Sequence, residues 1–265
     1  MVNLGVIFPP DLPPEELHSV ALAADDAGVA ELWLWEDCFA ESGIATAAAI
    51  LAWTERLRVG IGLLPVPLRN VALTAMELAT LARLFPGRLI HGVGHGVLDW
   101  MGQVGVRAQS PMTLLGEYTT ALRSLLAGET VTSSGRYVQL DAVGLTWPPE
   151  APLPVLVGAV GPRTLTLAGE VGDGVILTGE TTIEALPAAV DLVRAGASSA
   201  GRDGEPPVVV FLTVADRPSA AEVADRVQSH VRAGATTVAL LSVGEDAPPL
   251  AEFARFAGAE VQPLL

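Results

Sequence analysis

Residues suited to binding an anion follow one of the short apolar runs of the sequence. The segment reads Gly158-Ala159-Val160-Gly161-Pro162-Arg163-Thr164. Its two glycines allow a ligand to approach the backbone closely, and its proline suits the first turn of a helix. Free N–H groups at the start of a helix, with an arginine beside them, can bind an anion without any lysine. The segment therefore predicts either a phosphate site or a plain tight turn between a strand and a helix.

A second group of reactive side chains combines two acids with the only cysteine of the chain. Trp35-Glu36-Asp37-Cys38 ends another apolar run. Adjacent residues of a strand point to opposite faces, so only one of Glu36 and Asp37 can enter a site. Cys38 is either a reactive thiol or a buried small hydrophobic residue, and a lone cysteine excludes an intramolecular disulfide.

The four histidines do not form a metal-binding pattern. His18 and His230 fall on predicted helices and are expected to face solvent, whereas His91, in mid-strand, is expected to be a hydrogen-bonded core residue. His91 and His95 are four residues apart but not on a helix, so they lack the geometry of a zinc pair. No metal site is predicted. A serine hydrolase is also excluded, because the sequence has no G-x-S-x-G elbow.

Composition narrows the class of protein further. Half of the 265 residues are apolar and 17% are charged, which excludes a disordered chain. The chain has 30 acidic residues and 15 basic residues, and all the basic residues are arginines. The resulting net charge of −15 argues against nucleic acid or an anionic membrane as a partner. The absence of lysine excludes Schiff-base chemistry and a P-loop. With no segment long enough to span a bilayer and no signal peptide, a cytoplasmic location is expected.

Eight short apolar runs define the elements that must position these side chains. They begin near Leu4, Leu32, Leu57, Leu89, Pro154, Gly174, Val208 and Val238. Most are one βα unit apart, and helical periodicity fills the intervals at Pro14 to Ala27, Val71 to Phe85 and Ala220 to Ala233. The pattern predicts an α/β protein with a (β/α)8 TIM barrel as a single domain over residues 1–265. An open doubly wound sheet is the alternative.

One interval, between the fourth and fifth runs, is longer than the others. It is predicted to hold a helix from Met112 to Ala127 and then a small hairpin from Glu129 to Leu140, turning at Ser133-Ser134-Gly135. A proline-rich linker, Trp147 to Pro154, leads to the fifth strand. Residues Asp99-Trp100-Met101-Gly102-Gln103, earlier in the interval, are expected to form a loop.

In such a barrel the chemistry lies where the strands end. The ends of strands two to six are unusually rich in glycine and polar residues: Trp35 to Cys38, Gly60 to Pro65, Gly92 to Gly96, Gly158 to Arg163, and Thr178-Gly179-Glu180. These five segments are therefore expected to meet at one mouth of the barrel. The glycine-rich fourth end would let a flat ligand lie close to the backbone.

These strand ends, in this order, resemble the bacterial luciferase-like flavin and deazaflavin oxidoreductases. The matching segments are Leu4 to Pro9; Ala27-Gly28 with Leu32 to Asp37; Trp53 to Gly60; Pro86 to Gly96; and Gly172 to Val175. The resemblance implies a (β/α)8 barrel that binds FMN or the deazaflavin coenzyme F420. Their tricyclic ring would lie over the ends of strands two to four, and their phosphate would lie after strand five.

The resemblance also implies roles for individual residues. Deazaflavin members support the ring on a non-prolyl cis peptide, which would fall at Gly62-Leu63. Asp37 would contact the polar edge of the ring, and Gly94, His95 and Gly96 would line its other flank. The cofactor phosphate would be held by Gly158, Ala159, Val160, Gly161, Arg163 and Thr164, with Thr178 completing the cofactor-binding set.

The sequence departs from the family at one catalytic position and in its length. Many deazaflavin members have histidine where Cys38 stands, and a thiol is a poor substitute for proton transfer near neutral pH. His95 therefore becomes the better catalytic candidate, beside Asp37 and Cys38. The chain is also short for the family, which implies a more open pocket. Its wall is expected from Leu64 to Leu68, Val97 to Gly105, Ala215 to Pro218 and Gly244 to Pro249.

The predicted function is an oxidoreductase that transfers a hydride between a small organic substrate and a deazaflavin or flavin. Coenzyme F420 is preferred to FMN, because the Gly92–Gly96 and Asp99–Gly102 stretches look most like the deazaflavin branch. Two alternatives remain: an FMN-dependent luciferase-like monooxygenase, and a cofactor-binding barrel without turnover. The family resemblance and the high apolar content also predict a homodimer.

Overall fold

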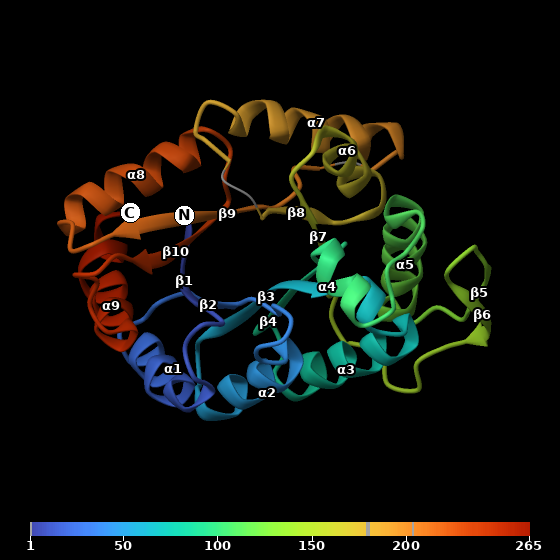
Figure 1. The fold of residues 1–265 in the computed structure, drawn as a ribbon, viewed down its shortest axis with the longest axis horizontal. Coiled ribbons are helices and arrows are strands. Elements are labelled where there is room, and N and C mark those ends of the chain that lie inside the picture. The colour runs from blue at the N-terminus through green and yellow to red at the C-terminus, as the bar shows by residue number, and fades with distance from the viewer. Residues whose placement is uncertain (1, 179–180, 203) are drawn as a thin grey trace.

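Eight parallel strands close into a barrel, which confirms the predicted (β/α)8 architecture (Figure 1). The structure is a computed structural model that describes residues 2–178, 181–202 and 204–265. Around the barrel the strands follow the order β1-β10-β9-β8-β7-β4-β3-β2, and β5 and β6 form a separate pair. The strands are β1 (Asn3–Phe8), β2 (Glu31–Leu34), β3 (Arg58–Pro65), β4 (Leu89–Gly94), β5 (Val131–Ser134), β6 (Gln139–Val143), β7 (Val155–Ala159), β8 (Gly174–Leu177), β9 (Val208–Ala215) and β10 (Thr237–Val243). Each barrel strand begins within one residue of its predicted start.

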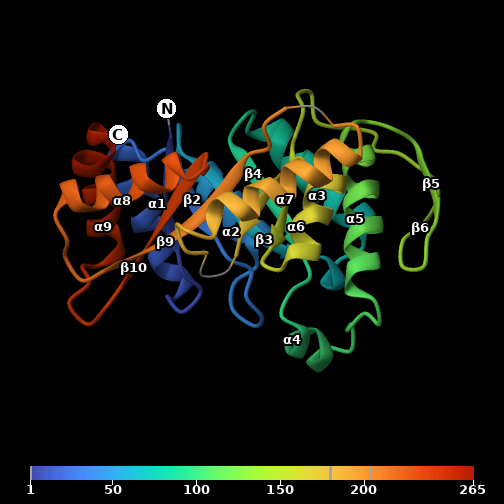
Figure 2. The same cartoon turned by 90° about the horizontal axis from the view of Figure 1, so that it is seen from above.

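Helices pack around the outside of the barrel, except α4, which lies at one end of it (Figures 1 and 2). They are α1 (Leu17–Asp26), α2 (Gly43–Trp53), α3 (Val71–Leu84), α4 (Leu98–Gln103), α5 (Pro111–Leu126), α6 (Pro162–Val171), α7 (Leu186–Ser199), α8 (Ala220–Arg232) and α9 (Leu250–Phe256), with short 3-10 turns at Pro14–Glu16, Val66–Leu68 and Gln262–Leu264 and a π turn at Ala257–Val261. Side chains of Ser42, Asn70 and Ser219 cap α2, α3 and α8 by accepting backbone N–H groups of their first turns. Within the described ranges, no helix combines the length and the apolar character that crossing a membrane requires.

The hairpin of β5 and β6 follows α5, as predicted, but its turn lies later than Ser133-Ser134-Gly135. The Gly135 N–H donates to the Val138 carbonyl oxygen at 3.0 Å, so the chain reverses over residues 135–138. The cause is Glu117 on α5, whose carboxylate accepts the three backbone N–H groups of residues 136–138. The Glu117 carboxylate ties the hairpin to α5 in the helix layer of the barrel.

The barrel interior is closed at mid-height by one large side chain. Trp33 on β2 is fully buried, and its indole lies across the neighbouring strands at Gly5 and Gly60. A Cβ atom at Gly60 would stand 2.5 Å from this ring, so only glycine allows the arrangement. The indole N–H of Trp33 donates to Glu31 at 2.8 Å. An inner apolar layer surrounds the ring: Ile7, Leu156, Ile176, Val209 and Ala239.

Residues 98–103, predicted to form a loop, form the short helix α4 instead. Met101 explains the difference, since its side chain is almost completely buried and packs beside Gly96. Burying one apolar side chain stabilises a single helical turn that the local sequence does not favour. The predicted strand end at Gly179-Glu180 lies outside the described residues.

The prediction for His230 is wrong, and the prediction for His91 is right about its burial but wrong about its hydrogen bonding. His230 is buried rather than solvated, because it lies on the inner face of α8, where its Nδ1–H donates to the Arg226 carbonyl oxygen at 2.8 Å. His91 is in the core, but both of its ring nitrogens lack a hydrogen-bond partner among the described residues. Burial lowers its pKa to about 4, so the ring is neutral near pH 7.

Candidate functional site

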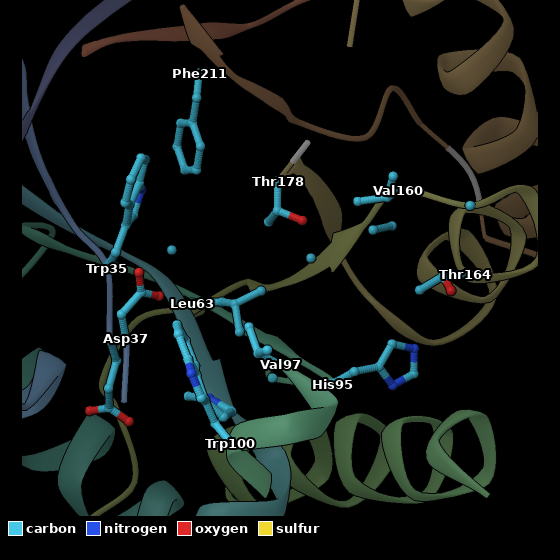
Figure 3. Close-up of a pocket in the computed structure, with 17 residues that line it drawn as sticks. Trp35, Asp37, Leu63, His95, Val97, Trp100, Val160, Thr164, Thr178 and Phe211 are labelled. Carbon is cyan, nitrogen blue, oxygen red and sulfur yellow. The ribbon is translucent and has the colours of Figure 1, made fainter. Parts of the chain in front are cut away.

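A cavity of about 420 Å³ opens at the carboxyl ends of the barrel strands (Figure 3). Strands β2, β3, β4, β7, β8 and β9 contribute to it, or the residues directly after them do. Its lining residues are Trp35, Glu36, Asp37, Gly62, Leu63, Pro65, His95, Gly96, Val97, Trp100, Gly158, Ala159, Val160, Gly161, Thr164, Thr178 and Phe211. The strand ends singled out in the sequence therefore meet at one place.

Most of the predicted cofactor-binding residues line this cavity, and three predicted site residues do not. Those present are Asp37, Gly62, Leu63, His95, Gly96, Gly158, Ala159, Val160, Gly161, Thr164 and Thr178. Cys38, Gly94 and Arg163 lie outside the lining. Gly94 lies beneath Leu63, and Arg163 is exposed at the start of α6.

Leu63 forms the floor of the cavity between two glycines. The Gly62–Leu63 peptide bond is cis, as the sequence comparison predicted, and the Cys38–Phe39 bond is cis as well. A Cβ atom would lie 2.1 Å from Leu63 Cδ2 at Gly158 and 2.5 Å from it at Gly94. A side chain at either position would therefore force Leu63 to shift.

The two adjacent acids that follow β2 have different surroundings. Glu36 is buried and accepts both Nη groups of Arg69, at 2.8 and 2.9 Å, together with the Gly43 N–H at 2.7 Å. Burial raises the pKa of Glu36, although Arg69 and Gly43 act to lower it. Asp37 is half-buried and directs its carboxylate into the cavity (Figure 3). Burial raises the pKa of Asp37 too.

Cys38 follows these acids but does not reach the cavity. Its thiol is half-buried, and its pKa is raised by burial and then by the neighbouring charges of Glu36 and Asp37. A raised pKa keeps the sulfur protonated near neutral pH, where a thiol is a weak nucleophile and a poor proton donor. Nothing in this geometry supports the catalytic role considered for Cys38.

His95 stands on the opposite side of the cavity from Asp37 (Figure 3). Its Nδ1 is buried without a hydrogen-bond partner in the described part of the chain. Burial lowers the pKa of His95, and a backbone contact at Pro111 only partly offsets this. A neutral imidazole facing a ligand cavity can donate or accept one proton near pH 7.

The start of α6 presents unpaired donors to the same cavity. Gly161 is the N-cap residue, and Pro162 is the first helical residue. The space beside Gly161 is open, because a Cβ atom added there would meet no other atom within 4 Å. The N–H groups of Arg163 and Thr164 are in the first turn, where no helix carbonyl precedes them. The Thr164 hydroxyl contacts Met112 Sδ at 3.6 Å. An anion in the cavity would meet these groups and the positive end of the helix dipole.

Two aromatic residues line the cavity that were not predicted to bind the cofactor, although Trp35 belongs to a strand end expected at this mouth. Trp35 and Phe211 pack with ring centroids 5.5 Å apart, and the buried Trp35 Nε1 has no partner among the described residues. Alternation along β9 could have placed Phe211 inward with Val209. The wall expected from Ala215 to Pro218 and from Gly244 to Pro249 does not line the cavity, whereas Pro65, Val97 and Trp100 do.

The residues present fit a cofactor with a flat ring and a phosphate. The glycine-backed floor, the aromatic wall and the Asp37 carboxylate suit a ring with polar edges, and the α6 terminus suits a phosphate. Among the described residues, His, Cys, Asp and Glu side chains form no group of three or more that could hold a metal ion.

Comparison with known proteins identifies related chains. The family model described as luciferase-like monooxygenase matches residues 3–262. The 5,10-methylenetetrahydromethanopterin reductase of Methanolobus tindarius is 30% identical over 202 residues, covering 76% of this chain and 61% of that protein. The F420-dependent glucose-6-phosphate dehydrogenase of Nakamurella multipartita is 29% identical over 204 residues, covering 71% of this chain and 60% of that protein. The chain thus spans about three fifths of the length of these relatives.

A solved structure supports the same fold. The coenzyme F420-dependent tetrahydromethanopterin reductase from Methanopyrus kandleri superimposes with a TM-score of 0.85. Its sequence is 20% identical, and the match covers 99% of both chains. The barrel and its order of strands are therefore shared with a structure of the same overall size.

Proposed function

Since the chain belongs to the luciferase-like monooxygenase family, we propose that it is an oxidoreductase that uses coenzyme F420, or alternatively FMN. The observation that carries this proposal is one cavity that combines the Leu63 floor, the Asp37 carboxylate and the open start of α6. One of the relatives described above supports F420, because the Nakamurella multipartita dehydrogenase is named as F420-dependent. The family description, which names a monooxygenase, supports a monooxygenase as the alternative.

Each part of the cavity has a distinct task in this proposal. The bound cofactor supplies a ring that can give or take a hydride. Leu63 supports the ring from below, and Asp37 accepts a hydrogen bond from its polar edge. His95 would hold or release a proton at its ring nitrogen, and the backbone N–H groups of Gly161, Arg163 and Thr164 would bind the phosphate.

The substrate proposed here is small, organic and uncharged. Among the described lining residues there is no arginine, and the chain has no lysine. The name of one relative implies a sugar phosphate as the substrate of that protein. In the present cavity such a substrate would find no lysine or arginine side chain for its phosphate, since the start of α6 is assigned to the phosphate of the cofactor. Val97 and Trp100 instead offer apolar surface at the mouth of the cavity.

The test is cofactor titration followed by turnover. The protein is titrated with F420, FMN and riboflavin, and binding is followed by absorbance and fluorescence. The reduced cofactors are then offered with uncharged aldehydes, ketones and enones, with and without oxygen. Oxidation of reduced F420 by an organic acceptor supports the proposal. Oxygen-dependent turnover of reduced FMN would instead support the monooxygenase, and tight binding without any turnover would support a cofactor-binding barrel.

We also propose that the protein is a homodimer through α2 and α3. Helix α2 contains no charged residue, and Trp53 at its end is exposed. Leu73, Met76 and Leu84 are exposed on the adjoining α3. Several exposed apolar side chains on two adjoining helices are typical of a subunit interface. Light scattering of wild type and Met76→Asp tests it: the variant is expected to be monomeric, and a monomeric wild type would contradict the proposal.

A further inference from the structure

A second cavity lies at the opposite mouth of the barrel, where the strands begin. Its volume is about 450 Å³. It is formed by the first residues of β1, β2, β3, β4, β7, β9 and β10 and by the proline-rich segment that precedes β7. Figure 2 shows the segments before β7 and β9 at the end of the barrel away from α4. No described residue lines both cavities.

Trp33 separates the two cavities. Its ring lines the second cavity, and Phe211, which lines the first, packs against it edge-on at a centroid distance of 6.1 Å. The indole cannot move aside easily, because Gly5 and Gly60 contact its faces and Glu31 accepts its N–H. The second cavity is therefore a compartment of its own and not an extension of the candidate active site.

The polar centre of the second cavity is Arg58. One Nη of Arg58 donates to Glu31, whose other carboxylate oxygen is already occupied by the Trp33 N–H. Glu31 is almost completely buried, whereas 35% of the Arg58 side chain is accessible. Its other N–H groups have no hydrogen-bond partner within the described ranges and lie at the cavity. The ion pair would therefore offer a ligand the remaining N–H groups of Arg58, because both carboxylate oxygens of Glu31 already accept hydrogen bonds.

The charges around the cavity compensate one another. Arg58 pairs with Glu31, Arg83 with Glu150, and Arg194 with Glu205. A charged ligand would therefore have to leave water without finding an unpaired opposite charge. The net charge of −15 further disfavours an anion. The rest of the wall is mainly apolar, with Ile90 and Leu89 of β4 and the prolines at 154 and 207.

We propose that this mouth is a second binding site, for an uncharged apolar molecule that carries one hydrogen-bond acceptor such as a ketone, ester or amide oxygen. The acceptor binds the free N–H edge of Arg58, and the apolar body packs against Ile90 and the two prolines. The site is independent of the function proposed for the first cavity. Its occupancy is expected whether or not F420 or FMN is bound.

The test uses 6-propionyl-2-(dimethylamino)naphthalene, an uncharged naphthalene ketone whose emission shifts to the blue in apolar surroundings. Saturable binding is expected in wild type, with and without excess FMN. Ile90→Trp, which places a larger ring in the second cavity, is expected to weaken binding at least about tenfold. The matched control Val160→Trp crowds the mouth of the first cavity and is expected to leave the affinity unchanged. Thermal unfolding of both variants shows that they are folded.

Competition then tests the role of Arg58 without altering the protein. 2-Acetylnaphthalene is expected to displace the probe about fivefold more effectively than 2-ethylnaphthalene, which lacks the acceptor. Charged 2-naphthoate is expected to be the weakest of the three. The proposal is overturned if Val160→Trp and not Ile90→Trp abolishes binding, if FMN displaces the probe, or if naphthoate competes best.

Discussion

Arg69→Met is expected to destabilise the fold by breaking a buried ion pair. Arg69 binds both carboxylate oxygens of Glu36, whose side chain is only 7% exposed. Breaking a buried ion pair by removing one partner typically costs about 3–5 kcal/mol, because the other charge stays buried and unpaired. Glu36 keeps the Gly43 N–H, so we expect the lower end, about 3 kcal/mol at pH 7.

The loss should depend on pH in a defined direction. Burial already raises the pKa of Glu36 above its ordinary value of 4.5, and Arg69 acts to lower it. Without Arg69 the pKa rises further, so the folded variant holds a proton that the unfolded chain has released. Stability gained from that proton is lost as pH rises through the folded pKa. The deficit of Arg69→Met relative to wild type is therefore smallest at mildly acidic pH and largest above neutrality.

Urea unfolding at several pH values, followed by tryptophan fluorescence, measures both effects. Arg217→Met is the matched control, since its partner Glu252 and Arg217 itself are more than half exposed, and a change within about 1 kcal/mol is expected. The double variant Glu36→Gln/Arg69→Met removes the stranded charge and should recover most of the loss. The reasoning is refuted if Arg69→Met costs no more than the control, or if the double variant is as unstable as Arg69→Met alone.

Three further predictions concern the candidate active site. Gly158→Ala should weaken cofactor binding at least about tenfold and cost about 1–3 kcal/mol of stability, because its Cβ would overlap Leu63. The control Gly116→Ala lies on α5 outside the cavity, where a Cβ meets only Leu167 at 3.6 Å, and titration and unfolding experiments should show unchanged cofactor binding and no loss of stability. Arg163→Ala should weaken FMN about fivefold but not riboflavin, which lacks the phosphate, and equal losses for both ligands would remove Arg163 from the phosphate site. His95→Gln should abolish the change of kcat/KM with pH below the ordinary histidine value of 6.5, whereas a variant with the wild-type profile would show that His95 moves no proton.

The alternation of apolar runs and helical segments was sufficient to predict the barrel. Most barrel strands are bounded on at least one side by a glycine, proline or polar residue, and a parallel barrel buries its strands on both sides, so the runs stand out. The candidate site followed from topology, since parallel strands end at one mouth. The cis bond at Gly62-Leu63 was predicted by family resemblance and not by any local preference of the two residues.

Other features depend on which residues the closed barrel brings together. Glu36 and Arg69 are 33 positions apart, and no periodicity links them. Phe211 lines the cavity because β9 turns that face inward, and His230 is buried because α8 packs with its histidine face against the protein. The sequence by itself determined the order of strands and helices and which segments lie at the mouth of the barrel, because local patterning encodes these. Only the tertiary structure decided which side chains reach the cavity, how their charges are paired and that Trp33 leaves a second cavity, because these depend on contacts between distant segments.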